Sequence, residues 1–188
     1  MENFSNDISK SIEVLKKGGT ILYPTDTIWG IGCDATNPNA VKKVYNIKER
    51  EKGKAMIVLF DTIGHIEKYV KRIPLKIKQM ILQSTPVTVI FSNAEGLTNN
   101  LLADDNSIAI RKTNEIFSKT LITEFGKPIV STSANKSGNK YPKNFSEISA
   151  DIIDAADYVV EYRQKEYAKT LPSKIIKLLA DDSIQQIR

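Results

Sequence analysis

Two segments rich in hydroxyl side chains follow short apolar stretches of the sequence. Residues 23–27 read Tyr-Pro-Thr-Asp-Thr, and residues 131–135 read Ser-Thr-Ser-Ala-Asn. Serine, threonine and asparagine offer neutral hydrogen-bond donors and acceptors, which suit a small polar substrate and the oxygens of a phosphate. The same residue types also form turns readily, so a purely structural role is the alternative interpretation of both segments.

A short basic run is the third feature with chemical potential. Four cations occur within seven residues, at Lys48, Arg50, Lys52 and Lys54. Arginine can hold a phosphate through two parallel hydrogen bonds, and lysine supplies mobile point charges, so the run could clamp a polyphosphate or a nucleic acid. The alternative is a solvated helix end, because cations stabilise the C-terminal end of a helix and Glu49 and Glu51 alternate with them.

Histidine and cysteine are too scarce to support several common kinds of site. The 188 residues include one histidine, His65, and one cysteine, Cys33. This excludes disulfide frameworks, cysteine zinc sites and multi-histidine metal sites. His65 lies in a helical pattern with no nucleophile signature nearby, and we interpret Cys33 as a small apolar core residue. The remaining chemistry is the binding and orientation of anions by Lys, Arg, Ser, Thr and Asn.

The elements that must position these groups alternate between helices and strands. Helical patterns cover residues 6–17, 63–71, 74–83, 114–125 and 146–155, and a helix of about three turns begins at Asn37-Pro38. Strands are predicted at residues 20–23, 55–60, 87–91, 107–111, 128–131, 157–162, 173–179 and 184–188. Gly30-x-Gly32 is interpreted as a turn, since the third glycine of a dinucleotide loop is missing.

This alternation favours an open α/β sheet, and short strand connections make a mixed sheet the expected form. Ligands of such sheets bind outside the carboxyl ends of strands, where both hydroxyl-rich segments would lie. The length predicts one domain over residues 1–188, with a formal net charge of +5. The longest apolar run, residues 55–60, is far shorter than the ~18 residues of a membrane span, and no signal peptide is visible. We therefore expect a cytoplasmic protein without membrane attachment.

Taken together, these residues resemble the YrdC family, the threonylcarbamoyl-AMP synthases of tRNA modification. The resemblance is carried by residues 23–35 (Tyr-Pro-Thr-Asp-Thr-Ile-Trp-Gly-Ile-Gly-Cys-Asp-Ala), Lys48-x-Arg50, residues 85–90, residues 107–111, residues 128–135 and Ser173. Order and approximate spacing match from about residue 10 onward. The first motif, together with the Lys-x-Arg and Ser-x-Asn pair, is the most specific part.

The resemblance implies a twisted open mixed β-sheet flanked by helices, with a basic concave cleft. It implies a nucleotidyltransferase that joins L-threonine, bicarbonate or CO2 and ATP into threonylcarbamoyl-AMP and pyrophosphate, with Mg2+ present. A separate transferase complex then moves the threonylcarbamoyl group onto tRNA. Whether tRNA itself touches this protein is left open.

The resemblance also assigns roles to residues by their positions. Threonine-contacting positions are Thr27, Arg111, Ser131 and Ser173. Nucleotide-lining positions are Arg50, Lys54, Ser107, Ser133, Asn135 and Arg188. Lys48 and Arg50 form the signature expected to act in catalysis, by stabilising charge on the phosphates. No residue is predicted to bind a metal directly.

Two other functions remain open from the sequence. One is a non-catalytic module that binds RNA or a nucleotide in the same basic cleft, although few aromatic residues alternate with the cations as a stacking platform requires. The other is an enzyme that forms a carbamoyl-adenylate for a different acceptor. The chain departs from the family pattern at several positions, among them Trp29, Glu51, Ala55 and Leu59.

Overall fold

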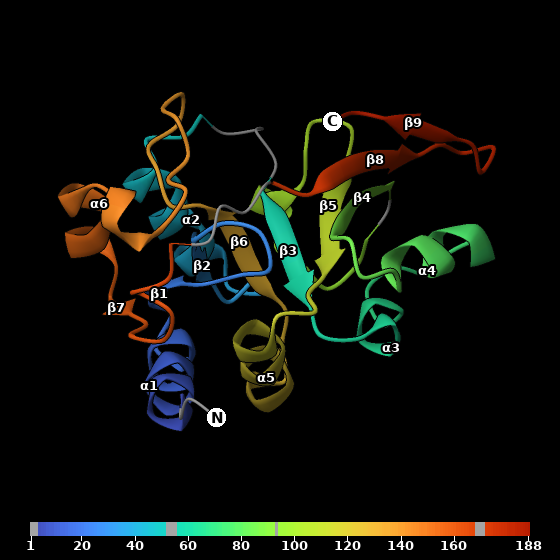
Figure 1. The fold of residues 1–188 in the computed structure, drawn as a ribbon. Helices are drawn as coiled ribbons and strands as arrows, with labels where there is room; N and C mark the ends of the chain where they lie inside the picture. Colours follow the sequence, from blue (N-terminus) through green and yellow to red (C-terminus); the bar gives the residue numbers. More distant parts are fainter. Residues whose placement is uncertain (1–3, 52–55, 93, 168–171) are drawn as a thin grey trace.

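This computed structural model describes residues 4–51, 56–92, 94–167 and 172–188. Within these residues, nine strands form one mixed sheet. The strands are β1 (Thr20–Tyr23), β2 (Gly30–Cys33), β3 (Ile57–Phe60), β4 (Val87–Ser92), β5 (Ser107–Lys112), β6 (Ile129–Ser133), β7 (Tyr158–Val159), β8 (Lys174–Leu178) and β9 (Ile184–Gln186). Their order across the sheet is β7-β1-β2-β6-β3-β5-β4-β8-β9 (Figure 1). Three neighbouring pairs are parallel (β1 with β7, β3 with β5, β4 with β8) and the others are antiparallel. The predicted open mixed α/β sheet is confirmed.

Helices cover both faces of this sheet. They are α1 (Ser5–Lys16), α2 (Pro38–Ile47), α3 (Ile63–Ile66), α4 (Leu75–Ile81), α5 (Ile116–Phe125) and α6 (Ala150–Ala155). The ends of the longer ones follow local signals: the Asn37 side chain accepts hydrogen bonds from the first backbone N–H groups of α2, and Gly126 ends α5 at a φ of 75°. None of the helices in the described ranges combines the length and apolar character that a bilayer span requires.

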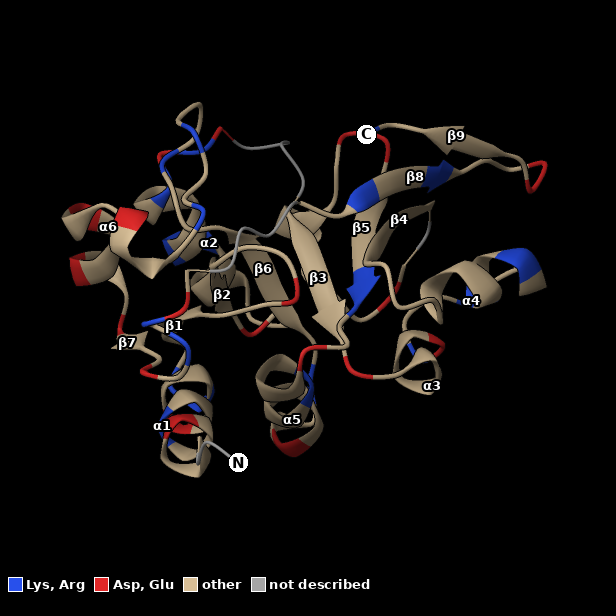
Figure 2. Ribbon diagram, in the orientation of Figure 1, with Lys and Arg blue, Asp and Glu red and all other residues tan. Residues whose placement is uncertain are grey.

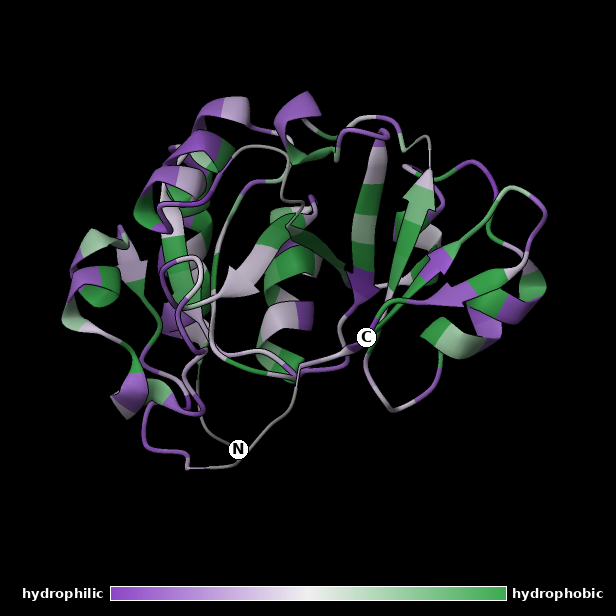
Figure 3. Cartoon of the chain, turned by 90° about the horizontal axis from the view of Figure 1, so that it is seen from above, coloured by the Kyte–Doolittle hydropathy of each residue, from purple (hydrophilic) through white to green (hydrophobic). Residues whose placement is uncertain are grey.

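Two hydrophobic clusters hold the helices against the sheet. The first packs α1 and α5 on one face, where Leu59 of β3 meets Phe117 of α5. The second packs α2 and α4 on the other face, where Val58 and Phe60 of the same strand point. Successive residues of a strand face opposite sides, so β3 contributes to both clusters. Burying each large apolar side chain stabilises the fold by about 1.5–3 kcal/mol, and Figure 3 shows apolar residues concentrated along the strands.

The prediction of a turn at Gly30-x-Gly32 was wrong, because these residues form β2. This strand lies so close to its neighbours that a Cβ atom on Gly32 would approach the Val130 carbonyl oxygen to 2.1 Å and the Tyr23 ring to 2.9 Å. Glycine permits such close approach of two strands, but its low strand propensity hides the strand from sequence patterns.

Several other elements are shorter than predicted. The helix expected over residues 146–155 begins only at Ala150. The helix expected over residues 63–71 ends at Ile66, and the Tyr69 carbonyl instead accepts a hydrogen bond from the Glu95 backbone N–H. The strand expected over residues 157–162 is reduced to Tyr158–Val159. Beyond it, the Asp7 carboxylate accepts the backbone N–H groups of residues 161 and 162 and so takes them out of the sheet.

Candidate active site

A cavity of about 230 Å³ opens where β2, β3, β5 and β6 meet the segment that leads into β8. Its wall includes seven residues predicted from the sequence, namely Thr27, Arg50, Arg111, Ser131, Ser133, Ser173 and Arg188. They come from six separate places in the chain, so only the folded sheet brings them together. Tyr141 and Trp29 also line the cavity.

Four further predicted residues are not part of this wall. Within the described ranges, Lys48, Ser107 and Asn135 lie outside it, and Lys54 falls outside the described residues. Ser107 begins β5, is 4% exposed and donates its backbone N–H to the Asp105 carboxylate. Asn135 donates its side-chain NH2 to two backbone carbonyls of its own loop, and its Oδ1 atom is buried without a hydrogen-bond partner among the described residues.

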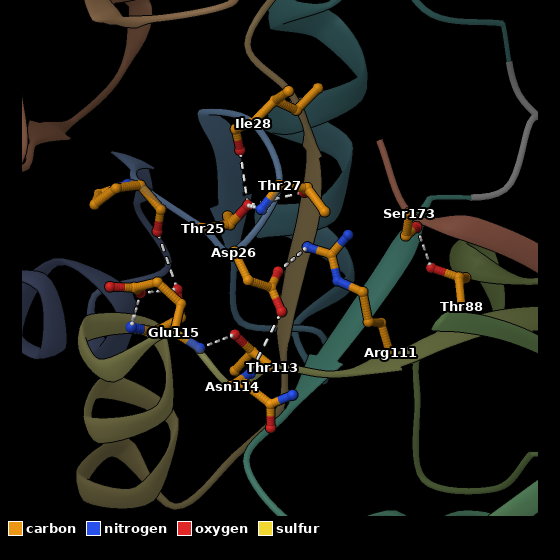
Figure 4. A network of polar contacts seen from close by, with 12 residues as sticks. Thr25, Asp26, Thr27, Ile28, Thr88, Arg111, Thr113, Asn114, Glu115 and Ser173 are labelled. Carbon is orange, nitrogen blue, oxygen red and sulfur yellow. Dashed lines mark hydrogen bonds and ion pairs between the residues drawn. The ribbon is translucent and has the colours of Figure 1, made fainter. Parts of the chain in front are cut away.

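The turn after β1 holds one edge of the cavity in place. The Thr25 hydroxyl donates to the Ile28 carbonyl at 2.8 Å and accepts the Thr27 backbone N–H at 3.0 Å. The hydroxyls of Thr25 and Thr27 are also 3.0 Å apart, and both side chains are buried (Figure 4). The Thr27 hydroxyl therefore meets a ligand from a fixed position.

A buried ion pair forms the base of the same region. Arg111 on β5 is 3% exposed, and its Nη2 atom lies 3.2 Å from Oδ1 of Asp26. The other Asp26 oxygen accepts the backbone N–H of Asn114 at 3.3 Å (Figure 4). The Arg111 Nε and Asp26 Oδ1 atoms are both buried without a hydrogen bond from any described residue. The guanidinium thus retains donor capacity that a carboxylate could use.

Ser173 approaches Arg111 from the other side of the cavity. Its hydroxyl lies 2.7 Å from that of Thr88, which is fully buried on β4 and is paired with Arg111 across the β4–β5 ladder. Arg188 then donates from Nε and Nη2 to the Ser173 carbonyl at 3.3 and 3.1 Å. The strand pairings fix these contacts between residues that lie far apart in sequence.

Sequence reasoning assigned no role to Asp26 or Thr88. Both were visible inside segments that carry the resemblance, at residues 23–35 and 85–90. What was missing was the pairing: Asp26 contacts Arg111 and Thr88 contacts Ser173 only through the tertiary structure.

Lys48 occupies an unexpected position for a member of a basic run. It is 1% exposed, and its Nζ atom donates to the backbone carbonyls of Ser133 and Asn135, at 2.5 Å each. Burial, reinforced by the nearby Arg50 guanidinium, lowers the pKa of Lys48 to about 7. Burial also lowers the pKa of Arg50, which does line the cavity.

The scarce nucleophile types lie away from the cavity, as expected. Cys33 is fully buried in the apolar core, which confirms its interpretation as a core residue, and burial raises the pKa of its thiol. His65 belongs to α3 and pairs with Asp61 at 2.7 Å, while its ring packs edge-on against Phe60. Neither Cys33 nor His65 lines the cavity.

The departures from the family pattern affect the cavity unequally. Leu59 is fully buried in the cluster with α5, so it does not face the cavity. Trp29 does line it, and its ring packs 4.9 Å from that of Phe145. Glu51 is exposed, and Ala55 falls outside the described residues.

The profile of the Sua5/YciO/YrdC family, described as "Telomere recombination", matches residues 13–188. The chain belongs to the Sua5/YciO/YrdC family. A threonylcarbamoyl-AMP synthase of Pseudoalteromonas translucida is 36% identical over 82% of this chain and 84% of its own length. Another of that name, from Vibrio parahaemolyticus, is 32% identical over 93% of this chain and 94% of its own length.

Solved structures of Sua5/YciO/YrdC proteins share this fold. E. coli YciO has a TM-score of 0.83 at 22% identity, with 97% of this chain and 88% of that chain covered. P. abyssi Sua5, in a structure complexed with L-threonine, has a TM-score of 0.87 at 20% identity. All of this chain is covered there, but only 55% of the Sua5 chain.

Proposed function

We propose that this protein is a threonylcarbamoyl-AMP synthase that joins L-threonine, bicarbonate or CO2 and ATP. The observation that carries the proposal is the cavity in which a buried, ion-paired Arg111 and the hydroxyls of Thr27, Ser131 and Ser173 lie together with Arg50 and Arg188. Relatives that match most of the chain, at 36% and 32% identity, bear the name of this enzyme.

The side of the cavity around Arg111 fits a small amino acid. The Arg111 guanidinium would take the threonine carboxylate, because a planar fork of donors matches two carboxylate oxygens. The hydroxyls of Thr27, Ser131 and Ser173 line the same region and would hold the amino and hydroxyl groups. Asp26 keeps Arg111 in place before the substrate arrives.

The side around Arg50 fits the nucleotide. Arg50, Ser133 and Arg188 line the cavity there, and two fixed guanidinium groups suit the charge of a triphosphate. Ser107, Asn135 and Lys54 remain predicted nucleotide contacts.

A magnesium ion fits this side as a companion of the phosphates. The described residues contain no group of three His, Cys, Asp or Glu that could hold a metal, but Mg2+ bound to a nucleotide takes most of its ligands from phosphate and water. No residue of the chain is assigned as a direct ligand of the ion, because the described cavity wall carries no carboxylate. When bound, the ion would neutralise charge on the phosphates.

The reaction needs orientation and charge stabilisation, which these residues supply. The threonine nitrogen attacks the carbon of CO2, which bicarbonate gives on losing hydroxide, and passes a proton to solvent, giving a carbamate. A carbamate oxygen then attacks the α-phosphorus, and pyrophosphate leaves. Neither step requires a nucleophile from the protein, and Arg50, which lines the cavity, would stabilise the charge that develops on the phosphates.

The wider setting belongs to the same proposal. Residues 1–188 act as one domain in the cytoplasm, and the adenylate passes to a separate transferase complex that modifies tRNA. The alternative of a non-catalytic RNA-binding module fits less well, because the guanidinium groups converge on a cavity of small-molecule size.

The deciding experiment measures pyrophosphate release from ATP and magnesium, with and without threonine and bicarbonate, followed by mass analysis of the product. Release that requires both co-substrates, together with detection of threonylcarbamoyl-AMP, is expected. Release with a different amino acid would indicate another acceptor. Tight, salt-sensitive RNA binding without any release would favour the binding module.

A further inference from the structure

The end of α2 is tied to the segment that leaves β6 mainly through Lys48, beside an ion pair at 2.6 Å between Glu49 and Lys136. The Lys48 ammonium donates to the carbonyls of Ser133 and Asn135, and the Lys48 carbonyl accepts the Ser137 backbone N–H at 2.8 Å. These three hydrogen bonds connect Lys48 to residues 133–137, here called the β6 exit segment. Lys48 therefore connects two parts of the chain that are about 85 positions apart in sequence.

Each part that Lys48 joins carries a residue of the cavity wall. Arg50 follows Lys48 by two positions, and its backbone N–H donates to the Tyr45 carbonyl at 3.0 Å, so it is fixed relative to the end of α2. Ser133 begins the β6 exit segment and also lines the cavity. The Lys48 side chain, which makes the two buried contacts to this segment, therefore contributes to the spacing between Arg50 and Ser133.

The burial of Lys48 argues against direct contact with a phosphate. Only 1% of the residue is exposed, and it does not belong to the described cavity wall. Two of its three N–H donors already point at backbone carbonyls. Burying a cation is costly unless it is well hydrogen-bonded, and here the main chain supplies those bonds. The loop between β6 and α6 carries three further lysines, Lys136, Lys140 and Lys143 (Figure 2).

We propose that Lys48 is a positioning residue, which sets the spacing of Arg50 and Ser133 across the nucleotide side of the cavity and acts on the reaction only through them. The effect on the reaction rests on the proposed function. The effect of Lys48 on the β6 exit segment can be measured without any substrate.

Two substitutions at Lys48 and one control separate this role from its alternatives. Lys48→Met keeps most of the length and removes all donors, while Lys48→Gln keeps two N–H donors on a shorter side chain. Lys43→Met is the matched control, because Lys43 also lies on α2 and donates to a backbone carbonyl, that of Gly18, away from the cavity.

The first measurement is amide hydrogen exchange of the β6 exit segment without substrates. In Lys48→Met we expect the Ser137 amide to exchange at least ~10-fold faster, since its protection depends on this local structure. Lys48→Gln should lie between Lys48→Met and the wild type, and Lys43→Met should match the wild type. Unchanged exchange in Lys48→Met would overturn the proposal.

The second measurement separates the two substrates. For Lys48→Met we expect kcat/KM for ATP to fall about 100-fold, the size of effect that a displacement near 1 Å produces. The dissociation constant for threonine alone should change less than about 3-fold, because Arg111 and Asp26 keep their contacts. Lys48→Gln should recover part of the loss.

The outcomes distinguish the proposal from its neighbours. Loss of ATP turnover with unchanged exchange would mean that Lys48 touches the phosphates directly. Faster exchange with unchanged ATP kinetics would mean that the contacts of Lys48 with the β6 exit segment do not affect the reaction, which would overturn the catalytic part of the proposal. If the wild type releases no pyrophosphate, the proposed function fails, and the affinity of each variant for a non-hydrolysable ATP analogue then decides the proposal. If Lys48→Met does not fold, Lys48→Gln carries both measurements.

Discussion

The two sides of the cavity are built from different kinds of contact. Around Arg111, side chains contact other side chains: Arg111 on β5 pairs with Asp26 in the turn after β1, and Thr88 on β4 contacts Ser173 just before β8. On the nucleotide side, side chains donate to the main chain. Lys48 donates to two carbonyls of the β6 exit segment, and Arg188 donates to the carbonyl of Ser173, whose hydroxyl belongs to the threonine side. The threonine side suits a small rigid substrate, because each of its polar side chains is held by a fixed partner. On the nucleotide side the contacts fix the position of the backbone. The side chains that line the cavity there then remain available to the larger ligand.

The largest effect is expected on the nucleotide side. Arg50→Ala should lower kcat/KM for ATP by roughly 200- to 900-fold, because removing one fixed donor from developing phosphate charge costs on the order of 3–4 kcal/mol. Threonine affinity should stay within about 3-fold, since the Arg111 side is untouched. Pyrophosphate release and calorimetric threonine binding check both parts. Arg72→Ala is the control, because Arg72 pairs with Asp182 on the exposed surface. Equal losses for both substrates would show that the two sides are not independent.

A somewhat smaller effect is expected at the base of the threonine side. Asp26→Asn leaves a buried Arg111 without its charge partner, and breaking such pairs costs about 3–5 kcal/mol when a partner is removed outright, so about 2–3 kcal/mol is expected for the isosteric change. Denaturant unfolding measures this loss, and threonine affinity should fall while the affinity for an ATP analogue does not. Asp105→Asn, which removes a surface pair with Lys177, should leave the threonine affinity unchanged. A threonine affinity that is unaffected in Asp26→Asn would contradict the orienting role.

The nucleotide side should also carry a distinctive pH dependence of stability. The pKa of Lys48 is lowered to about 7 in the folded protein, so between pH 7 and about 10 the unfolded chain binds more protons. The unfolding free energy should therefore rise with pH in this window, with a slope of at most ~1.4 kcal/mol per pH unit. Lys48→Met should lose this component, and the difference between the two unfolding curves isolates it. Parallel curves would mean that the carbonyl contacts offset the burial and keep the ammonium charged.

The smallest effect tests a single hydroxyl contact. Thr88→Val preserves the shape but removes the partner of the Ser173 hydroxyl, so KM for threonine should rise about 5-fold, as expected for one hydrogen bond worth ~1 kcal/mol. Thr88→Ser should restore the wild-type KM because it keeps the hydroxyl. Steady-state kinetics at saturating ATP measures both variants. A rise in KM that serine does not reverse would indicate packing in place of hydrogen bonding.

Local patterns predicted most of the sheet, because alternating apolar residues and turn signals are local properties. The strand β2 was not predicted, because its glycines allow a close approach to β6 that is visible only in the folded sheet. The site divided in the same way. Motif positions pointed to Thr27 and Arg111, whereas the contact between Asp26 and Arg111 depends on how distant segments meet. The burial of Lys48 could not be read from a charged run, since tertiary packing decides which of its cations faces inward.

The position of Arg188 has a practical consequence. Its backbone N–H and carbonyl both bond to Ile175 on β8, and its side chain lines the cavity, whereas α1 lies at the opposite side of the molecule (Figure 1). Any residues that follow Arg188, whether natural or added by cloning, would leave from the rim of the cavity and compete with the nucleotide for space. An affinity tag for these assays should therefore precede α1. A carboxyl-terminal tag would lower the apparent affinity for the nucleotide.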